Sequence, residues 1–308
     1  MADHGSSVRL PARRSGRAPP PDLIGRREGM AALAGQPRPL GVDIGFADIA
    51  GVSCAVCTPQ APRGKAVHFH GGGYRLGAAA AWAPFGARLA AACGLQVLVP
   101  DYALAPEHPF PAALHDAVAV VEALAESDAG GPLVLSGDSA GGGLALSCAL
   151  AAGVAGHMID GLLLLSPWLD LTVTAATYQT CATTDQLFSH AAATEAAEAY
   201  LQGVSPRDPL ASPLFGDLAL TPPTLVLASA GEVLLQDSLA LASGLAAVGR
   251  YVQLHVVPDQ PHVWPVLQPD TPASGRALQA AAAFVAHQLG HAPNRAASAA
   301  LGAHPRNR

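Results

Sequence analysis

A serine lies between two glycines in the motif Gly-Asp-Ser-Ala-Gly, with Ser139 at its centre. The apolar run 132–135 precedes the motif, and the glycine- and leucine-rich run 142–146 follows it. This order predicts a strand, a sharp turn and a helix, in which Gly137 and Gly141 lack the side chains that would collide with neighbouring elements. Such a turn pushes the Ser139 hydroxyl out of the sheet, where it could attack a substrate carbonyl.

A second glycine-rich run, His70-Gly71-Gly72-Gly73, follows another predicted strand. Successive glycines expose bare backbone N–H groups, and acyl transfer through a serine puts negative charge on the former carbonyl oxygen. Preorganised donors for that oxyanion contribute about 2.7–4 kcal/mol each. The loop can supply two donors, and the N–H of Ala140, directly after the candidate nucleophile, a third. A glycine triplet alone more often forms a plain turn, but its place ahead of the serine motif favours the oxyanion interpretation.

Strands and helices in alternation must position these residues. Mostly apolar runs predict strands at 66–70, 95–99, 133–135, 162–165 and 224–227, and a sixth strand is predicted at 252–257. Helix-length segments between and after them lie at about 80–93, 112–127, 140–153, 237–249 and 273–289. This alternation predicts an α/β fold with a mostly parallel sheet and helices on both faces. Asp237 or Ser238 would cap the fourth of these helices, and Gly249 would end it.

The segment 171–220 interrupts this alternation with polar residues, a proline-rich run and one helical stretch at 191–201. Because it is too long for a simple connector, we predict that it contributes to a cap over the active site. Residues 1–20 and 291–308 lack apolar periodicity, so we predict that both ends are disordered. A single domain is expected at 21–290.

The composition of the 308-residue chain narrows the function classes. Its 17 basic and 23 acidic residues give a net charge of −6 and are scattered, which argues against a nucleic-acid partner. No apolar run approaches the roughly 20 residues that a membrane-spanning helix needs. The arginine-rich start lacks the apolar core of an export signal, so we expect a cytoplasmic protein. Cys54 and Cys57 fall in a predicted strand without a second Cys/His pair, so we expect buried thiols and no metal site.

The two glycine motifs together resemble those of the hormone-sensitive-lipase family of α/β-hydrolases, the bacterial family IV esterases. Three further stretches also resemble that family: 101–113, 166–168 and 210–214. The similarity extends over about 40–290, although Ala103 stands where the family usually has Arg, which puts the local ion pairing in doubt. The resemblance implies an α/β-hydrolase fold with an eight-stranded sheet and a helical cap formed by about 21–45 and 171–205.

A serine hydroxyl needs a base, and His262 follows the last predicted strand at the sheet edge that also holds the serine turn. The family places its catalytic histidine in a similar Pro-x-His-x-Phe/Trp context, whereas His255 lies inside the strand. For the acid, chain order and the family's spacing to the histidine favour Glu232, which would fix the tautomer of His262. Asp237, and Asp170 after the preceding strand, stay open as alternatives.

The resemblance implies a serine carboxylester hydrolase that acts on short-chain or small-molecule esters through an acyl-enzyme, without cofactor or metal. We expect the oxyanion to be held by the N–H groups of Gly72, Gly73 and Ala140, with His70 and Gly71 supporting the loop. Two other functions stay open: a lactone-opening, dehydrating or cyclising biosynthetic enzyme on the same scaffold, and a non-catalytic small-molecule receptor. The expected partner is a small ester, and the chain could form a homodimer.

Overall fold

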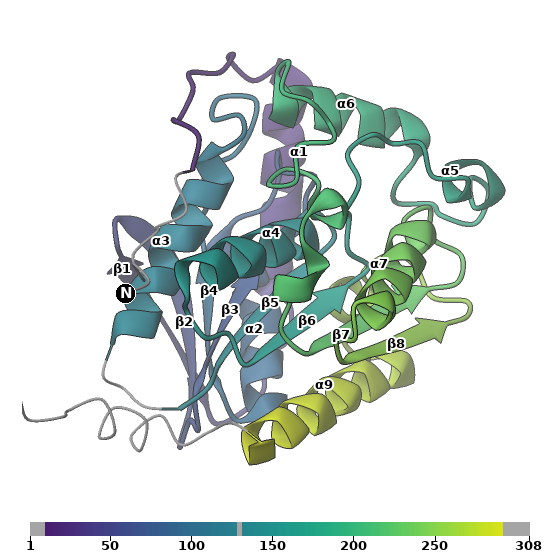
Figure 1. Cartoon of the computed structure of the whole chain (residues 1–308). Helices are drawn as coiled ribbons and strands as arrows, with labels where there is room; N and C mark the ends of the chain where they lie inside the picture. Colours follow the sequence, from purple (N-terminus) through teal and green to yellow (C-terminus); the bar gives the residue numbers. More distant parts are fainter. Residues whose placement is uncertain (1–9, 128–130, 292–308) are drawn as a thin grey trace, which may run out of the picture.

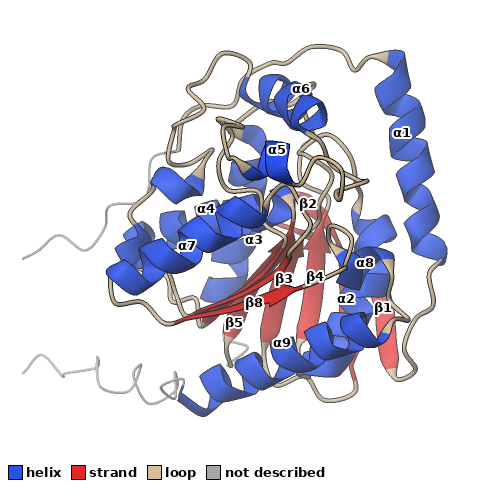
Figure 2. Ribbon diagram, turned by 90° about the vertical axis from the view of Figure 1, so that its right-hand side faces the viewer, coloured by secondary structure: helices blue, strands red, loops and turns tan. Residues whose placement is uncertain are grey.

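A computed structural model describes residues 10–127 and 131–291. Within these residues one eight-stranded sheet lies between two layers of helices (Figure 1, Figure 2). The strand order is β1-β2-β4-β3-β5-β6-β7-β8. Strand β2 pairs antiparallel with β1 and β4, and every other neighbouring pair is parallel. The predicted fold class, a mostly parallel sheet with helices on both faces, is confirmed.

The strands reproduce the six predicted segments to within a few residues, β2 contains the strand predicted at Cys54 and Cys57, and β1 is added at the start. Strands β5, β6 and β7 are buried along their whole length, because helices cover both faces of the sheet. The strands are β1 (Val42–Ile49), β2 (Val52–Pro59), β3 (Lys65–Phe69), β4 (Gln96–Pro100), β5 (Leu133–Asp138), β6 (Gly161–Leu165), β7 (Thr224–Ser229) and β8 (Val252–Val257).

Two hydrophobic cores fill the spaces between sheet and helices. Helices α2, α8 and α9 enclose one core, which contains Trp82, Trp264 and Phe284. Helices α3, α4 and α7 enclose the other core, which continues into the segment between β6 and β7. The described helices are α1 (Pro21–Ala31), α2 (Ala79–Cys93), α3 (Ala112–Glu126), α4 (Ala140–Ala155), α5 (Thr177–Thr180), α6 (His190–Leu201), α7 (Leu235–Ala247), α8 (Trp264–Leu267) and α9 (Pro272–His291).

The segment between β6 and β7 carries α5 and α6, which lie with α1 at the top of the molecule (Figure 1). Figure 1 shows α6 next to α1, and the side chain of Arg26 on α1 lies 4.0 Å from that of Glu195 on α6. Strand β1 begins at Val42, so residues 42–45 belong to the sheet and not to the cap that the sequence predicted there.

Residues 10–20 run along the surface and make long-range contacts. The Arg13 guanidinium lies 2.5 Å from the carboxylate of Asp116, and Arg14 donates to the backbone oxygens of Leu201 and Gln202. The predicted disorder is therefore wrong for this part of the N-terminal segment, because its arginines find acceptors on the body of the protein. Residues 1–9 and 292–308, which also fall in predicted disordered ends, lie outside the described residues.

The start of α7 differs from the sequence prediction, whereas its end agrees with it. The predicted cap of α7 is wrong, because the helix is preceded by Leu234 and the buried Asp237 lies within its first turn. Gly249, with a φ of 72°, follows the end of this helix as expected.

Cys54 and Cys57 are buried free thiols on β2, and burial raises the pKa of each to about 12. Among the described residues, no helix has both the length and the apolar character needed to cross a membrane.

Candidate active site

Ser139 lies at the turn between the end of β5 and the start of α4. Its φ of 53° falls in the left-handed region, a strained conformation for a serine. A Cβ atom on Gly137 would collide with the backbone of Gly141, and one on Gly141 would collide with the carbonyl group of Phe69. The close packing of β5, α4 and β3 therefore requires both glycines, and the turn presents Ser139 at the carboxyl edge of the sheet.

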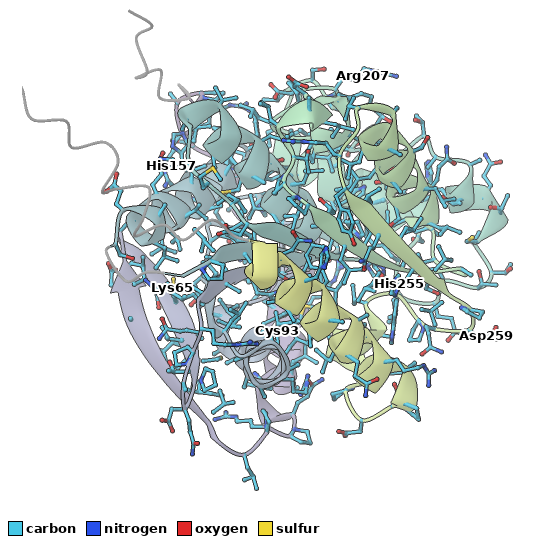
Figure 3. The ribbon with its side chains drawn as sticks, turned by 60° about the horizontal axis from the view of Figure 1, so that its bottom comes forward. Lys65, Cys93, His157, Arg207, His255 and Asp259 are labelled. Atoms are coloured by element: carbon cyan, nitrogen blue, oxygen red, sulfur yellow. The ribbon has the colours of Figure 1, made fainter. Side chains whose placement is uncertain are left out.

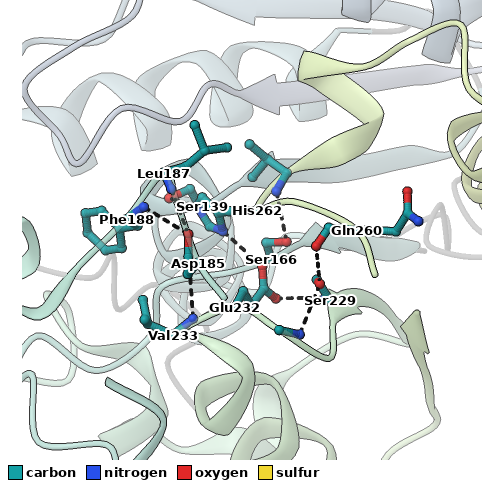
Figure 4. A network of polar contacts seen from close by, with 12 residues as sticks. Ser139, Ser166, Asp185, Leu187, Phe188, Ser229, Glu232, Val233, Gln260 and His262 are labelled. Carbon is teal, nitrogen blue, oxygen red and sulfur yellow. Dashed lines mark hydrogen bonds and ion pairs between the residues drawn. The ribbon is translucent and has the colours of Figure 1, made fainter. Parts of the chain in front are cut away.

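Three residues singled out by the sequence form a hydrogen-bonded chain at this edge (Figure 4). The Ser139 Oγ atom lies 3.0 Å from Nε2 of His262, and Nδ1 of His262 lies 2.9 Å from Oε2 of Glu232. The backbone N–H of Ser229 donates to the other oxygen of Glu232, which fixes the carboxylate. All three side chains are buried, whereas His255 is exposed on the edge strand β8 (Figure 3). These hydrogen bonds allow a proton to pass from the Ser139 hydroxyl to the His262 imidazole.

The charges around His262 favour its protonated form. Burial alone would lower the pKa of His262, but the hydrogen bond and the charge of Glu232 outweigh this effect and raise the pKa above its ordinary value. The charges of Asp185 and Asp138 act in the same direction. If His262 accepted the proton of Ser139, these charges would stabilise the resulting imidazolium.

The carboxylates of Asp237 and Asp170, the alternative candidates for the acid, contact groups other than His262. Asp237 accepts the backbone N–H groups of Leu169 and Asp170, at 2.7 and 3.0 Å. Burial, with the charges of Asp170 and Glu232, raises the pKa of Asp237 to about 7 against the effect of these two hydrogen bonds. The side chain of Asp170 accepts a backbone N–H two residues further on. Within the described chain, neither carboxylate is hydrogen-bonded to His262.

The glycine loop after β3 supplies free backbone donors beside Ser139. Gly72 and Gly73 have positive φ angles of 115° and 61°, and both line the same cavity as Ser139. Among the described residues, their N–H groups have no hydrogen-bond acceptor. Ala140 is the first residue of α4, so its N–H has no partner within the helix. These three N–H groups are available to a substrate oxygen.

Side chains beneath the loop hold it in position. Asp138 accepts the N–H of Gly71 at 3.0 Å and the indole N–H of Trp82 at 2.8 Å, so the Gly71 N–H serves the loop itself. His70 donates through Nδ1 to the carbonyl oxygen of Gly71, and its ring stacks on Tyr102 at 4.2 Å. Burial lowers the pKa of His70, which favours the neutral form of this ring.

Two functional side chains were missed by sequence reasoning, and both lie in the segment between β6 and β7. Phe188 stacks on the ring of His262, with 5.9 Å between ring centroids (Figure 4). Asp185 accepts the N–H groups of Leu187, Phe188 and Val233, each at 3.0 Å. Because Val233 directly follows Glu232, Asp185 connects the loop over His262 to the loop that carries Glu232. No local motif at Asp185 signals this contact.

A cavity of about 160 Å³ opens above these groups, and we call it the Ser139 cavity. Its polar wall contains Ser139, His262, Gly72 and Gly73. Much of its apolar wall comes from α1 and the segment between β6 and β7, through Met30, Leu187, Phe188 and Ala192. The arrangement of hydroxyl, imidazole, carboxylate and free N–H groups is that of a serine hydrolase.

Comparisons with known proteins agree with this class. The family described as alpha/beta hydrolase fold matches residues 66–266. An acetyl-hydrolase of Streptomyces hygroscopicus is 38% identical over 221 residues, which cover 71% of this chain and 74% of that protein. An esterase of Acinetobacter venetianus is 38% identical over 174 residues, or 56% of this chain and 57% of that protein.

Solved structures place the chain more narrowly. The crystal structure of an esterase from the bacterial hormone-sensitive lipase family superposes with a TM-score of 0.83 at 33% identity, covering 89% of this chain and 94% of that one. The chain belongs to the alpha/beta hydrolase fold family and, within it, to the hormone-sensitive-lipase-like esterases. It is a serine carboxylester hydrolase.

Proposed function

We propose that the chain hydrolyses short-chain esters of small molecules through an acyl-enzyme formed on Ser139. His262 takes the hydroxyl proton as Ser139 attacks the ester carbonyl, and Glu232 holds the imidazole and stabilises its charge. The oxyanion of the tetrahedral intermediate accepts the N–H groups of Gly72, Gly73 and Ala140. His262 then gives its proton to the leaving alcohol, and the acyl group stays on the serine.

Water completes the reaction from the same position. His262 takes a proton from water as the water oxygen attacks the acyl carbon, and it returns the proton to Ser139 as the carboxylic acid leaves. The observation that carries this proposal is the hydrogen-bonded chain from Ser139 through His262 to Glu232. A receptor that only binds its ligand has no need of such a chain, so this contact favours an enzyme.

The dimensions of the Ser139 cavity support a short acyl group. Its volume of about 160 Å³ is small beside the roughly 300–1,000 Å³ of pockets that enclose drug-sized ligands. We assign the cap to α1 and to the segment 171–205, because Met30, Leu187 and Phe188 from these elements line the cavity. A cytoplasmic location and a homodimer stay predictions.

The proposal is tested by the initial rates on 4-nitrophenyl acetate, butyrate and decanoate at equal concentrations. We expect turnover of acetate and butyrate, and a rate on decanoate at least about tenfold lower, because the cavity walls exclude a long chain. The lactone-opening alternative is tested in parallel with γ-butyrolactone. Turnover of the lactone without turnover of the open esters would contradict the proposal.

A further inference from the structure

Arg75 lies two residues after the glycine loop and carries a charge that ester hydrolysis itself does not use. Its side chain is only 4% exposed, and its buried Nε–H group has no hydrogen-bond acceptor in the described part of the chain. Arg75 lines the Ser139 cavity together with Ser139, Gly72 and Gly73. A buried guanidinium with an unpaired donor is costly unless another molecule supplies the acceptor.

A second guanidinium and one carboxylate complete the cluster. Nη1 of Arg75 lies 2.6 Å from Oε1 of Glu195, and Nη1 of Arg26 lies 4.0 Å from Oε2 of the same residue. Arg26 belongs to α1 and Glu195 to α6, so the cluster connects these two helices. Two cations therefore share a single carboxylate, which leaves one positive charge at this end of the cavity.

Asp138 adds a negative charge to the wall of the Ser139 cavity. Its carboxylate contacts His68 and the N–H groups of Gly71 and Trp82, and among the described residues it forms no ion pair with Arg75 or Arg26. Arg75 also lines a second cavity of about 320 Å³, together with Arg17, Glu198 and Glu195. Arg17 and Glu198 contribute opposite charges there. The Glu195 side chain is 53% exposed and borders this open space, so it has room to leave Arg75.

We propose that Arg75, assisted by Arg26, binds a carboxylate carried by the ester substrate, and that Glu195 occupies this position until the substrate displaces it. The planar guanidinium matches a carboxylate in a two-point hydrogen bond, which would also engage the unpaired Nε–H. The preferred substrates are then esters with a free carboxylate a few bonds from the scissile carbonyl. This inference rests on the proposed function, because the bond is still cleaved at Ser139.

The test compares each acid with an uncharged analogue of the same shape. One pair is monomethyl glutarate and its amide analogue, methyl 4-carbamoylbutanoate; the other is 4-acetoxybutyrate and 4-acetoxybutyramide. We expect kcat/KM for the acid to exceed that for the amide at least about tenfold in one pair, the size of a charge-assisted contact. The pair that shows the preference tells whether the carboxylate belongs to the acyl or to the alcohol part.

Three variants separate recognition from a merely structural ion pair. Arg75→Gln should bring the acid-to-amide ratio close to one, and Glu195→Gln should raise it, because the competing carboxylate is gone. Arg88→Gln is the matched control, since Arg88 also has a buried, unpaired Nε but binds Gln36 and Pro37 outside the cavity; its ratio should equal that of the wild type.

A wild-type ratio near one for both pairs, or a ratio that Arg75→Gln leaves unchanged, would overturn the inference. Hydrolysis of 4-nitrophenyl acetate by the wild type distinguishes this failure from a failure of the proposed function, because that neutral ester does not need Arg75.

Discussion

Two acidic side chains follow β7, but only that of Glu232 contacts His262. Chain order placed both Glu232 and Asp237 in the right region, because the acid is expected after this strand. Their directions depend on the turn between β7 and α7, where the N–H of Ser229 holds the Glu232 carboxylate. Asp237 instead lies in the first turn of α7 and binds the loop after β6. Residue spacing therefore indicates both Glu232 and Asp237 as candidate partners of His262. Only the geometry of the turn after β7 shows which of the two carboxylates contacts the imidazole.

The pH dependence of activity reports on this assignment. His262 acts as a base only when neutral, so kcat/KM should fall as the pH drops through its pKa. Glu232 raises that pKa. Glu232→Gln removes the charge, so the acid limb of the kcat/KM profile should move to lower pH while the plateau falls about 10²- to 10⁴-fold. The measurement is the pH profile for 4-nitrophenyl butyrate.

Asp237→Asn is the control for that profile, because an amide oxygen still accepts the two backbone N–H groups. It should retain the position of the wild-type acid limb. If Asp237→Asn moves the limb and Glu232→Gln leaves it in place, the acid has been assigned to the wrong residue.

Among the structural elements, turns with a characteristic local sequence could be predicted. The turn at Ser139 was predictable because glycines at both ends of the motif are required by its packing. The conformation of the loop over His262 could not be predicted, because it depends on a hydrogen bond between Asp185 and Val233, which are 48 residues apart in the sequence. A carboxylate that accepts N–H groups from two loops has the same local sequence as one that faces water.

Asp185→Ala tests whether this loop positions the active site. The substitution leaves the N–H groups of Leu187, Phe188 and Val233 without their acceptor, at a cost of roughly 1–3 kcal/mol for each that stays buried. Phe188 should then lose its fixed place against His262. We expect KM for 4-nitrophenyl butyrate to rise at least about fivefold, because Phe188 and Leu187 line the cavity.

The control is Asp208→Ala, at an aspartate that also accepts a backbone N–H in the same segment but does not line the cavity. Its KM should stay within about twofold of the wild-type value. Equal changes in KM for the two variants would show that Asp185 has only a general role in folding.

For the whole molecule, the interior of the sheet was more predictable than its edge. Buried strands such as β6 and β7 are apolar runs because both faces are covered by helices. β1 was missed because most of its side chains are exposed, and its sequence therefore lacks an apolar run. It forms a hairpin with β2, and the turn between them includes Gly51 with a φ of 83°.

Asp116 joins the N-terminal segment to the loop after β4, and it accepts the backbone N–H of Ala103. Arg13 supplies a guanidinium to the same carboxylate from 103 residues away in sequence. Arg27 on α1 likewise binds Glu107 at 2.6 Å. Such long-range pairs leave no periodic pattern, so composition alone suggested disorder where the structure has contacts.

The role of Ser139 as nucleophile is tested most directly by covalent labelling of the intact enzyme with a fluorophosphonate, followed by peptide mass spectrometry. Ser139 should carry one label per chain, and Ser139→Ala should bind none and lose ester hydrolysis while keeping its unfolding temperature. Label on a different serine, or ester hydrolysis retained in Ser139→Ala, would contradict the assignment of Ser139 as the nucleophile.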